Sequence, residues 1–163
     1  MTIVLILILI ITLGFGSVLL VGAPYLPTMK STRHDALYLL DLKPGQVFVD
    51  LGSGDGRLLV LAAQRGLKAI GYELNPLLWA YSWLRTWRYR RQVEIKLRSF
   101  WKADLSEADG VFVFLITRHM DALAKLLAGR KGKKLLKVVS HAFAIPGQKP
   151  TKKLGALFLY IYK

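Results

Sequence analysis

The stretch FVDLGSGDGR, residues 48–57, decides the fold of this chain. An apolar run ends at an acid, three glycines then alternate with small polar residues, and an apolar helical pattern follows. Such a strand, loop and helix are typical of an open α/β sheet, in which the ligand lies at the carboxyl ends of the strands. Glycines let the loop backbone approach a ligand closely and adopt positive φ. The stretch therefore predicts a cofactor-binding loop.

Apolar strands and helices alternate along the rest of the chain. Continuous apolar strands separated by helices predict an α/β fold with a mostly parallel sheet covered on both faces. The segment just before the last strand, residues 146–154, is only nine residues long. Because a parallel crossover needs about a dozen or more residues, we expect this strand to run antiparallel beside its predecessor. The predicted strands are 47–51, 68–73, 93–98, 111–116, 137–143 and 155–162, and the predicted helices are 33–42, 56–64, 76–89 and 120–127.

The spacing of glycines and acids distinguishes two cofactors for the loop. A dinucleotide site has the pattern G-x-G-x-x-G, whereas this loop reads G-x-G-x-G with Asp50 two residues before its first glycine. Carboxylates at Asp50 and Asp55 disfavour a pyrophosphate, because like charges repel in a partly buried site. The same carboxylates suit a ligand with a cationic amino group and a sulfonium. The loop therefore predicts S-adenosylmethionine.

A further acid ends the second predicted strand. The sequence GYELNP, residues 71–76, places Glu73 where its carboxylate can accept both ribose hydroxyls. The structural alternative is that Glu73 caps the helix that begins at Pro76, since acids are favourable near helix N-termini. Together with the glycine loop, the ribose role is the preferred interpretation.

These motifs resemble a known family. VDLGSGDGR followed by GYELNP resembles the class I, seven-strand-type methyltransferases, and specifically the membrane-anchored lysine N-methyltransferases that include mitochondrial enzymes for the ATP synthase c-subunit and the adenine nucleotide translocase. PYLPT, residues 24–28, is similar to the proline motif of that family, and RSFWK, residues 98–102, resembles the stretch after its third strand. The resemblance implies a Rossmann-like S-adenosylmethionine-dependent methyltransferase fold from residue 24 to the C-terminus.

Two positions depart from the pattern of related enzymes. Ser99 stands where many of them place an acid near the adenine, and residues 115–118 lack the Asn/Asp-Pro-Pro-aromatic motif of amide and adenine N-methyltransferases. The second departure disfavours those two substrate classes. No metal site is predicted. The predicted cofactor-binding residues are Asp50, Gly52, Ser53, Gly54, Asp55, Gly56, Glu73, Leu74, Asn75, Ser99 and Phe100.

The N-terminal segment differs from the rest of the chain. Residues 2–22 carry no charge, and a helix of this length spans ~30 Å of hydrocarbon. We expect a transmembrane anchor rather than a cleaved signal peptide, because no Lys or Arg precedes the run and the run exceeds the usual apolar core of ~7–15 residues. The expected organisation is an anchor at 1–23, a proline-containing linker with a lead-in helix at 24–45, and the methyltransferase domain at 46–163.

The charge distribution bears on location and partners. The first basic residues, Lys30 and Arg33, follow the apolar segment, so the positive-inside rule predicts a single-pass membrane protein with its catalytic domain on the cytoplasmic or matrix-equivalent side. A net charge of +14 suits an anionic lipid surface, nucleic acid or acidic partners. Beside an anchor, lipid is the simplest explanation, and nucleic acid is not expected. The absence of cysteine excludes disulfides, thiolate metal sites and a cysteine nucleophile.

Methyl transfer to an amine is an in-line displacement, so the protein mainly positions and desolvates the nucleophile. Thr117 and His141, near the ends of the fourth and fifth strands, are candidate catalytic residues; the structural alternatives are a helix cap and a satisfied histidine. We expect a protein-lysine N-methyltransferase for a membrane protein that presents a lysine. The alternatives are a methyltransferase for a lipid headgroup amine or small molecule, a non-catalytic cofactor-binding module and, less favoured, an RNA methyltransferase.

A tryptophan stripe runs along the predicted helix at 76–89. Trp79, Trp83 and Trp87 recur every four residues, and four arginines lie towards the end of the helix. Such a stripe usually packs on the sheet. In the alternative interpretation the indoles and arginines lie at the level of lipid headgroups.

Overall fold

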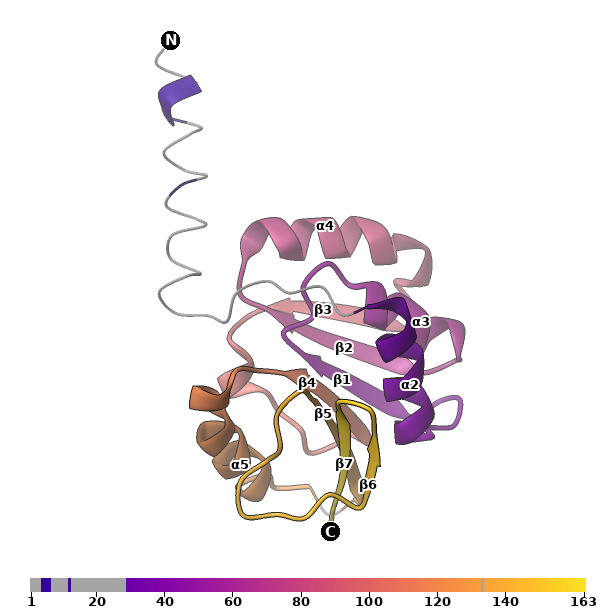
Figure 1. The fold of residues 1–163 in the computed structure, drawn as a ribbon. Coiled ribbons are helices and arrows are strands. Elements are labelled where there is room, and N and C mark those ends of the chain that lie inside the picture. Colours follow the sequence, from indigo (N-terminus) through magenta and orange to yellow (C-terminus); the bar gives the residue numbers. More distant parts are fainter. Residues whose placement is uncertain (1–3, 7–11, 13–28, 133) are drawn as a thin grey trace.

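A twisted, mostly parallel sheet forms the centre of the molecule (Figure 1). The computed structural model describes residues 4–6, 12, 29–132 and 134–163, and within them seven strands pair in the order β3-β2-β1-β4-β5-β7-β6. β1 to β5 run parallel, so their carboxyl ends meet at one edge, whereas β7 runs antiparallel to both of its neighbours. The strands are β1 Val47–Leu51, β2 Lys68–Glu73, β3 Val93–Leu97, β4 Gly110–Phe114, β5 Leu136–His141, β6 Lys152–Leu154 and β7 Leu157–Tyr162.

Helices cover both faces of this sheet. Alternate residues of β1 separate the two apolar cores: Phe48 packs with α2 and α3, while Val49 packs on the side of α5. α4 lies over β2 and β3 and contacts α3. The helices are α2 Lys30–Leu40, α3 Arg57–Gln64, α4 Pro76–Thr86 and α5 Met120–Ala128, and the 3₁₀ turns are η1 Trp87–Tyr89, η2 Phe100–Lys102 and η3 Thr117–His119.

The predicted strands are confirmed, and so is the antiparallel return of the last one beside β5. The structure adds β6, which lies within the predicted connection 146–154 and begins a hairpin. Gly155, at φ +57°, lies in the two-residue turn that joins β6 to β7. All three β6 residues are exposed, two of them lysines. Apolar patterning did not mark this strand because it buries no side chain.

The tryptophan stripe of α4 is divided by the structure. Trp79 faces the sheet, where its Nε1 donates to the carbonyl of Ile95 at 3.0 Å. Trp83 and Trp87 stack edge to face, with ring centroids 4.6 Å apart, and both are exposed. The expectation that the stripe packs on the sheet is therefore wrong for these two. Ser82 lies on the contact face of α4 instead. Its side chain is so close to Gly56 that a Cβ atom at position 56 would clash with it.

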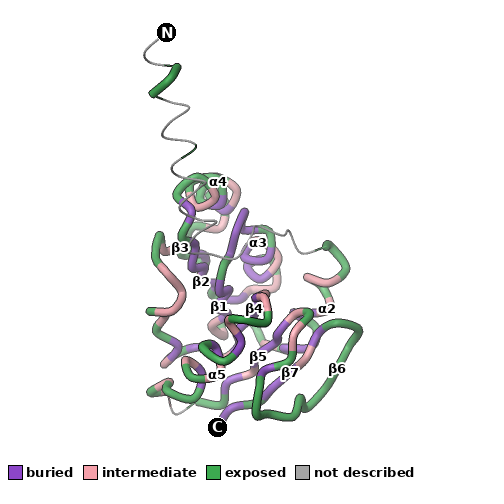
Figure 2. The backbone as a smooth tube through the Cα atoms, turned by 60° about the vertical axis from the view of Figure 1, so that its left-hand side comes forward, coloured by how far each residue is buried: buried purple, intermediate pink, exposed green. Residues whose placement is uncertain are grey.

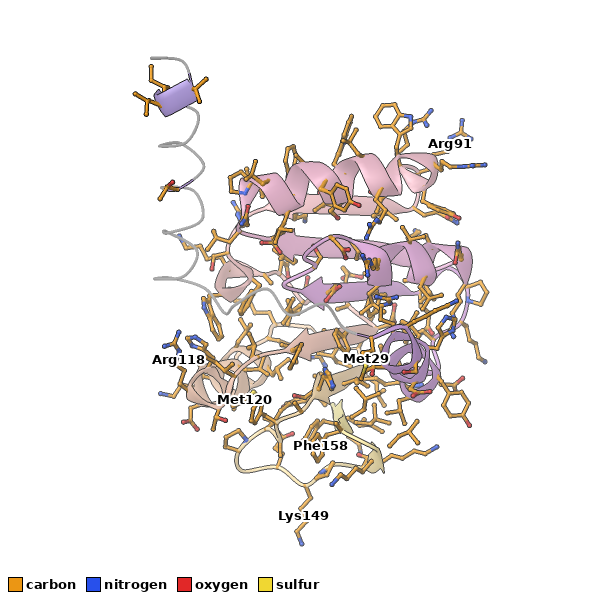
Figure 3. The ribbon with its side chains drawn as sticks, turned by 45° about the horizontal axis from the view of Figure 1, so that its top comes forward. Met29, Arg91, Arg118, Met120, Lys149 and Phe158 are labelled. Atoms are coloured by element: carbon orange, nitrogen blue, oxygen red, sulfur yellow. The ribbon has the colours of Figure 1, made fainter. Side chains whose placement is uncertain are left out.

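α4 lies at one end of the molecule and is largely exposed along its length (Figure 2). Arg91, just beyond it, and Lys149, before β6, lie at opposite ends (Figure 3). Across the described residues, no helix is long and apolar enough to cross a membrane. Apart from residues 4–6 and 12, the predicted anchor at 1–23 and the proline motif at 24–28 lie outside the described part of the chain.

Candidate functional site

The glycine loop between β1 and α3 is built on positive φ angles. Gly52, Gly54 and Gly56 have φ of +94°, +53° and +76°, a region that disfavours other residues. The amides of Gly52 and Ser53 donate to the carbonyl of Tyr72 at 3.0 and 2.9 Å, which fixes the start of the loop on β2. The predicted positive φ of these glycines is confirmed, and their close approach to a ligand stays a prediction.

Glu73 joins the loop to the end of β2. Its buried carboxylate accepts the amide of Gly54 through Oε2 and the amide of Asn75 through Oε1, both at 2.8 Å. A carboxylate has about four acceptor positions, so both oxygens retain capacity for a ligand's hydroxyls. The helix-cap alternative is wrong for Glu73, because the N-cap of α4 is Asn75, whose Oδ1 accepts the amides of Leu77 and Leu78. The ribose role of Glu73 stays a prediction.

Asp50 is a buried carboxylate near the carboxyl end of β1. Burial raises its pKa well above the ordinary value of 3.8, and the nearby charges of Glu73 and Asp55 raise this pKa further. None of the ion pairs formed by the described residues includes Asp50. A ligand that brings a positive charge would remove this electrostatic penalty, so the site fits a cofactor with an amino group and a sulfonium.

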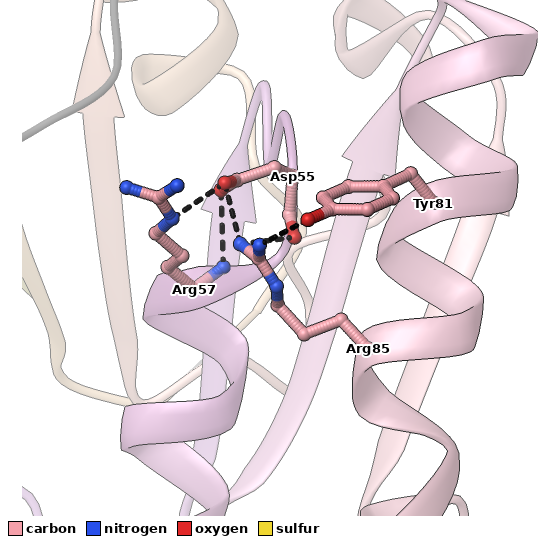
Figure 4. Close-up of polar contacts among 4 residues, drawn as sticks. All are labelled: Asp55, Arg57, Tyr81 and Arg85. Carbon is pink, nitrogen blue, oxygen red and sulfur yellow. Dashed lines mark hydrogen bonds and ion pairs between the residues drawn. The ribbon is translucent and has the colours of Figure 1, made fainter.

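Asp55 has a different environment, shown in Figure 4. Its Oδ2 pairs with Nε of Arg57 at 2.6 Å and with Nη1 of Arg85 at 2.5 Å. Arg85 also donates to the carbonyl of Asp55 at 3.2 Å and to the hydroxyl of Tyr81 at 2.7 Å. Two arginines already balance the charge of Asp55, so of the two loop acids that the sequence predicted to suit a cationic ligand, only Asp50 lacks a cation within the described chain. Its structural role is to fasten the loop to α4.

We expect Arg85→Met to loosen the glycine loop. The substitution leaves Asp55 with one cation and removes a partly buried charge-assisted bond worth ~1.5–3 kcal/mol. Denaturant unfolding should show a loss of this size for Arg85→Met and a smaller one for Arg85→Lys, which keeps the charge without the planar fork. Arg91→Met, at an exposed position, is the matched control. Equal stability of the Arg85 and Arg91 variants would contradict this role.

The remaining cofactor-site residues gather around Glu73. The amide of Arg98 donates to the carbonyl of Glu73 at 3.1 Å, which brings Ser99 and Phe100 beside the end of β2. Ser99 precedes η2 and makes no capping hydrogen bond with its side chain. Leu74 is exposed, whereas the hydroxyl of Ser53 is buried without a partner. The structure therefore brings the predicted residues to one end of β1 and β2, and their binding roles stay predictions.

The two candidate catalytic residues differ in environment. Thr117 is exposed, and it opens η3 rather than capping α5, whose N-cap position is His119. His141 ends β5, and its ring packs 4.3 Å from that of Phe114 on β4. Its Nδ1 is buried without a hydrogen-bond partner, and burial lowers its pKa below the ordinary 6.5. His141 is therefore a neutral imidazole with an unused nitrogen, not a satisfied core histidine.

We expect His141→Phe to slow methyl transfer by about 100-fold, the lower end of the usual contribution of a proton acceptor. Phenylalanine keeps the packing against Phe114 and removes both ring nitrogens. Because the pKa of His141 is lowered, the acidic limb of the wild-type pH–rate profile should lie below 6.5. His34→Gln on α2 is the control. An unchanged rate and pH profile in His141→Phe would exclude proton transfer by this side chain.

Sequence reasoning missed Arg85, Tyr81 and Ser82 as parts of this site. Arg85 is 30 positions from Asp55, and only the close packing of α4 on the loop brings the two together. The one local indication is that Tyr81 and Arg85 stand four apart, which places them on the same side of a helix. Nothing in the sequence connects that side with the glycine loop.

Three comparisons place the chain among known proteins. The family model of the ANTKMT methyltransferase domain matches residues 50–152. The ATP synthase c-subunit lysine N-methyltransferase of Xenopus laevis is 33% identical over 134 residues, which cover 81% of this chain and 58% of that protein. The protein-lysine N-methyltransferase of Saccharolobus islandicus (strain REY15A) is 30% identical over 131 residues, covering 78% of this chain and 81% of that protein.

A solved structure gives the same fold. An RNA methyltransferase from Salinibacter ruber, crystallised with S-adenosyl-L-homocysteine, superposes with a TM-score of 0.73 at 28% identity. The match covers 84% of this chain and 92% of that one. The chain thus spans nearly the whole of this structure but only 58% of the length of the Xenopus relative.

Proposed function

Since this chain belongs to the ANTKMT methyltransferase domain family, we propose that it is an S-adenosylmethionine-dependent protein-lysine N-methyltransferase that acts on a membrane protein. The observation that carries the proposal is the pairing of the glycine loop with Glu73, beside a buried Asp50 that no cation of the described chain neutralises. Relatives named as lysine N-methyltransferases, one of them for the c-subunit of the ATP synthase, support the substrate class.

Each side chain at this edge has a part in the proposal. Asp50 would provide the negative charge for the cationic end of the cofactor, Glu73 would accept from its ribose, and Ser99 and Phe100 would contact the adenine. When bound, S-adenosylmethionine supplies the electrophilic methyl group. The glycine loop holds the donor in place, and charge balance around Asp55 keeps that loop on α4.

The substrate side lies at the ends of β4 and β5. A lysine amine attacks only in its neutral form, and an environment with little water lowers its pKa in the required direction. Phe114 provides an apolar wall there, and His141, whose pKa is lowered by burial, stands beside it as the candidate proton acceptor. Thr117 stands at the exposed rim of the same edge.

The proposal includes a membrane location. The uncharged run at residues 2–22 would serve as a single-pass anchor, with residues 24–45 linking it to the catalytic domain at 46–163. The positive-inside rule then places this domain on the cytoplasmic or matrix-equivalent side. An anchor raises the effective concentration of membrane substrates over soluble ones, which suits a membrane-protein substrate. Anionic lipid is the proposed second partner, because the net charge is +14.

The test is incubation of the purified full chain with radiolabelled S-adenosylmethionine and membranes from a strain that lacks the protein. Acid-stable label on a lysine of one membrane protein, lost with Glu73→Ala, supports the proposal. Label that extracts with lipid would transfer the function to a headgroup amine, and label in RNA to a nucleic-acid substrate. Cofactor binding without any labelled acceptor would favour a non-catalytic module.

A further inference from the structure

α4 presents its large apolar side chains outward. Its buried residues are the small polar Ser82 and Thr86, and the hydroxyl of Thr86 bonds back to the carbonyl of Ser82 at 2.9 Å. A helix of a water-soluble domain normally shows the reverse arrangement. The exposed side chains are Leu77 (51%), Tyr81 (51%), Trp83 (44%), Leu84 (65%) and Trp87 (48%). We call these five residues the α4 face; Figure 2 shows how little of the helix is buried.

The segment that carries the α4 face has basic residues and no acidic ones. Residues 74–92 contain four arginines and no acid. The guanidinium of Arg90 lies 5.0 Å from the ring centre of Trp87, and Arg85 lies over the ring of Tyr81 at 4.6 Å. Exposed apolar patches rimmed by polar residues mark interaction sites. Here the rim selects an anionic partner.

A basic groove continues this surface towards α2 and α3. It has a volume of about 480 Å³, and its cationic lining includes Lys30, Arg33, Arg57 and Arg85. No acid is among the described residues that line it, although the adjoining Asp55 pairs with both Arg57 and Arg85. Arg85 belongs to both α4 and the groove, so the apolar face and the cationic groove form one continuous surface.

We propose that this surface binds an anionic phospholipid bilayer. The α4 face enters the headgroup region, and the arginines and the groove bind lipid phosphates. Trp and Tyr are enriched at the membrane interface, and interfacial helices combine such residues with a cationic border. A second copy fits less well, since a two-fold contact would bring the same arginines together. This inference rests on the proposed membrane location and deepens it by naming the contact surface.

The proposed orientation has a functional consequence. α4 begins directly after Glu73 and Asn75, so a helix lying in the headgroups holds the cofactor end of β2 next to the bilayer. A lysine of a membrane protein at headgroup level then reaches the catalytic edge without leaving the interface. An anchor alone would not fix this orientation, because the sequence after it contains Pro24 and Pro27, and proline disfavours a continuous helix.

The test uses the absence of cysteine from the chain. A spin label on Leu84→Cys in the full chain, reconstituted in vesicles of phosphatidylcholine and phosphatidylglycerol, reports its surroundings by its collision with oxygen or a nickel chelate. We expect at least about a threefold higher oxygen-to-nickel ratio at Leu84 than at the control Leu154→Cys on exposed β6, because apolar side chains of interfacial helices enter the lipid. A water-like ratio at Leu84 would overturn the proposal.

Two further arms make the result specific. Arg88→Glu with Arg91→Glu should reduce the ratio at Leu84 towards that of the control, and Lys149→Glu with Lys163→Glu, far from α4, should not. Spin–spin broadening that vanishes on dilution with unlabelled chain would instead identify a second copy and overturn the lipid assignment. If neither phosphatidylglycerol nor the arginine substitutions changed the ratio at Leu84, the proposed selectivity for anionic lipid would be overturned.

The experiments distinguish failure of the proposed lipid contact from failure of the proposed methyltransferase function. Glu73→Ala should abolish lysine labelling while leaving the oxygen-to-nickel ratio at Leu84 unchanged. A chain that floats with vesicles and methylates its substrate, yet keeps Leu84 in water, overturns the contact surface alone. A chain that does not float with vesicles overturns the anchor and the contact surface together.

Discussion

Replacing Glu73 by alanine should weaken cofactor binding by at least about 100-fold, since the two ribose hydroxyls would each lose a charge-assisted hydrogen bond of ~1.5–3 kcal/mol and 1.4 kcal/mol is a factor of ten. The carboxylate of Glu73 holds the amides of Gly54 and Asn75 at 2.8 Å. Alanine leaves both amides without their acceptor at the junction of the two loops. It also removes the acceptor for the ribose hydroxyls. Methyl transfer should fall with the affinity.

Isothermal titration calorimetry with S-adenosylhomocysteine measures this loss directly. Glu73→Gln should be nearly as harmful, because one side-chain oxygen becomes an NH₂ group that faces a backbone donor. Glu94→Ala is the matched control: Glu94 is an exposed acid on neighbouring β3, 3.6 Å from Lys96. Affinity of Glu73→Ala within about threefold of the wild type, a change of about 0.7 kcal/mol, would refute the role of Glu73.

The sequence predicted well what depends on neighbouring residues. The predicted bounds of β1 and β2 agree with the structure, because each strand is a short, mostly apolar stretch with an acid at or next to its last position. The glycine loop was recognisable because positive φ restricts the residues that fit. The ends of β1 and β2 form the site together because parallel neighbours end at the same edge, which the alternation of strands and helices already implied.

Charge balance around the loop acids could not be predicted. Asp50 and Asp55 are five positions apart and look equivalent in the sequence. The structure separates them because Arg85 comes from the far end of α4 to bond Asp55 and not Asp50. Which acid is neutralised depends on how α4 crosses the loop, and the loop permits that crossing only because Gly56 has no side chain.

The orientation of α4 could not be predicted from the sequence either. A four-residue spacing of indoles predicts a helix with an apolar side, and by itself it does not say whether that side faces the protein or its surroundings. Trp79 faces the sheet and Trp83 does not, although both belong to the same stripe. The deciding contact is the close approach of Ser82 to Gly56, which involves a residue that no apolar pattern marks.

Replacing Asp50 by asparagine should have opposite effects on stability and on cofactor binding. Without cofactor, Asp50 is buried beside Glu73 and Asp55, which raise its pKa together with burial. A raised pKa in the folded state means that ionisation opposes folding, so this group reduces stability as the pH rises above its ordinary pKa. Asn carries no charge at any pH. Asp50→Asn should therefore raise the melting temperature of the cofactor-free protein at neutral pH.

The expected gain is at least about 2–4 °C, the shift that ~1 kcal/mol produces in a chain of this size. The difference between the two proteins should shrink as the pH is lowered towards 3.8, the ordinary pKa of the carboxyl. Added S-adenosylmethionine should stabilise the wild type through binding and have little effect on Asp50→Asn, since the cationic end of the cofactor has lost its partner. Thermal melts at two pH values, with and without cofactor, measure all of this.

This prediction holds whether Asp50 is ionised or protonated in the cofactor-free protein at neutral pH. If it is ionised, the folded protein bears the cost of a buried charge next to two other acids. If it is protonated, the unfolded chain still gains the free energy of ionising that carboxyl, and the folded state is disfavoured by the same linkage. Identical melting of Asp50→Asn and the wild type without cofactor would mean that the pKa of Asp50 is not raised. The buried charge would then no longer explain why this site selects a cationic cofactor.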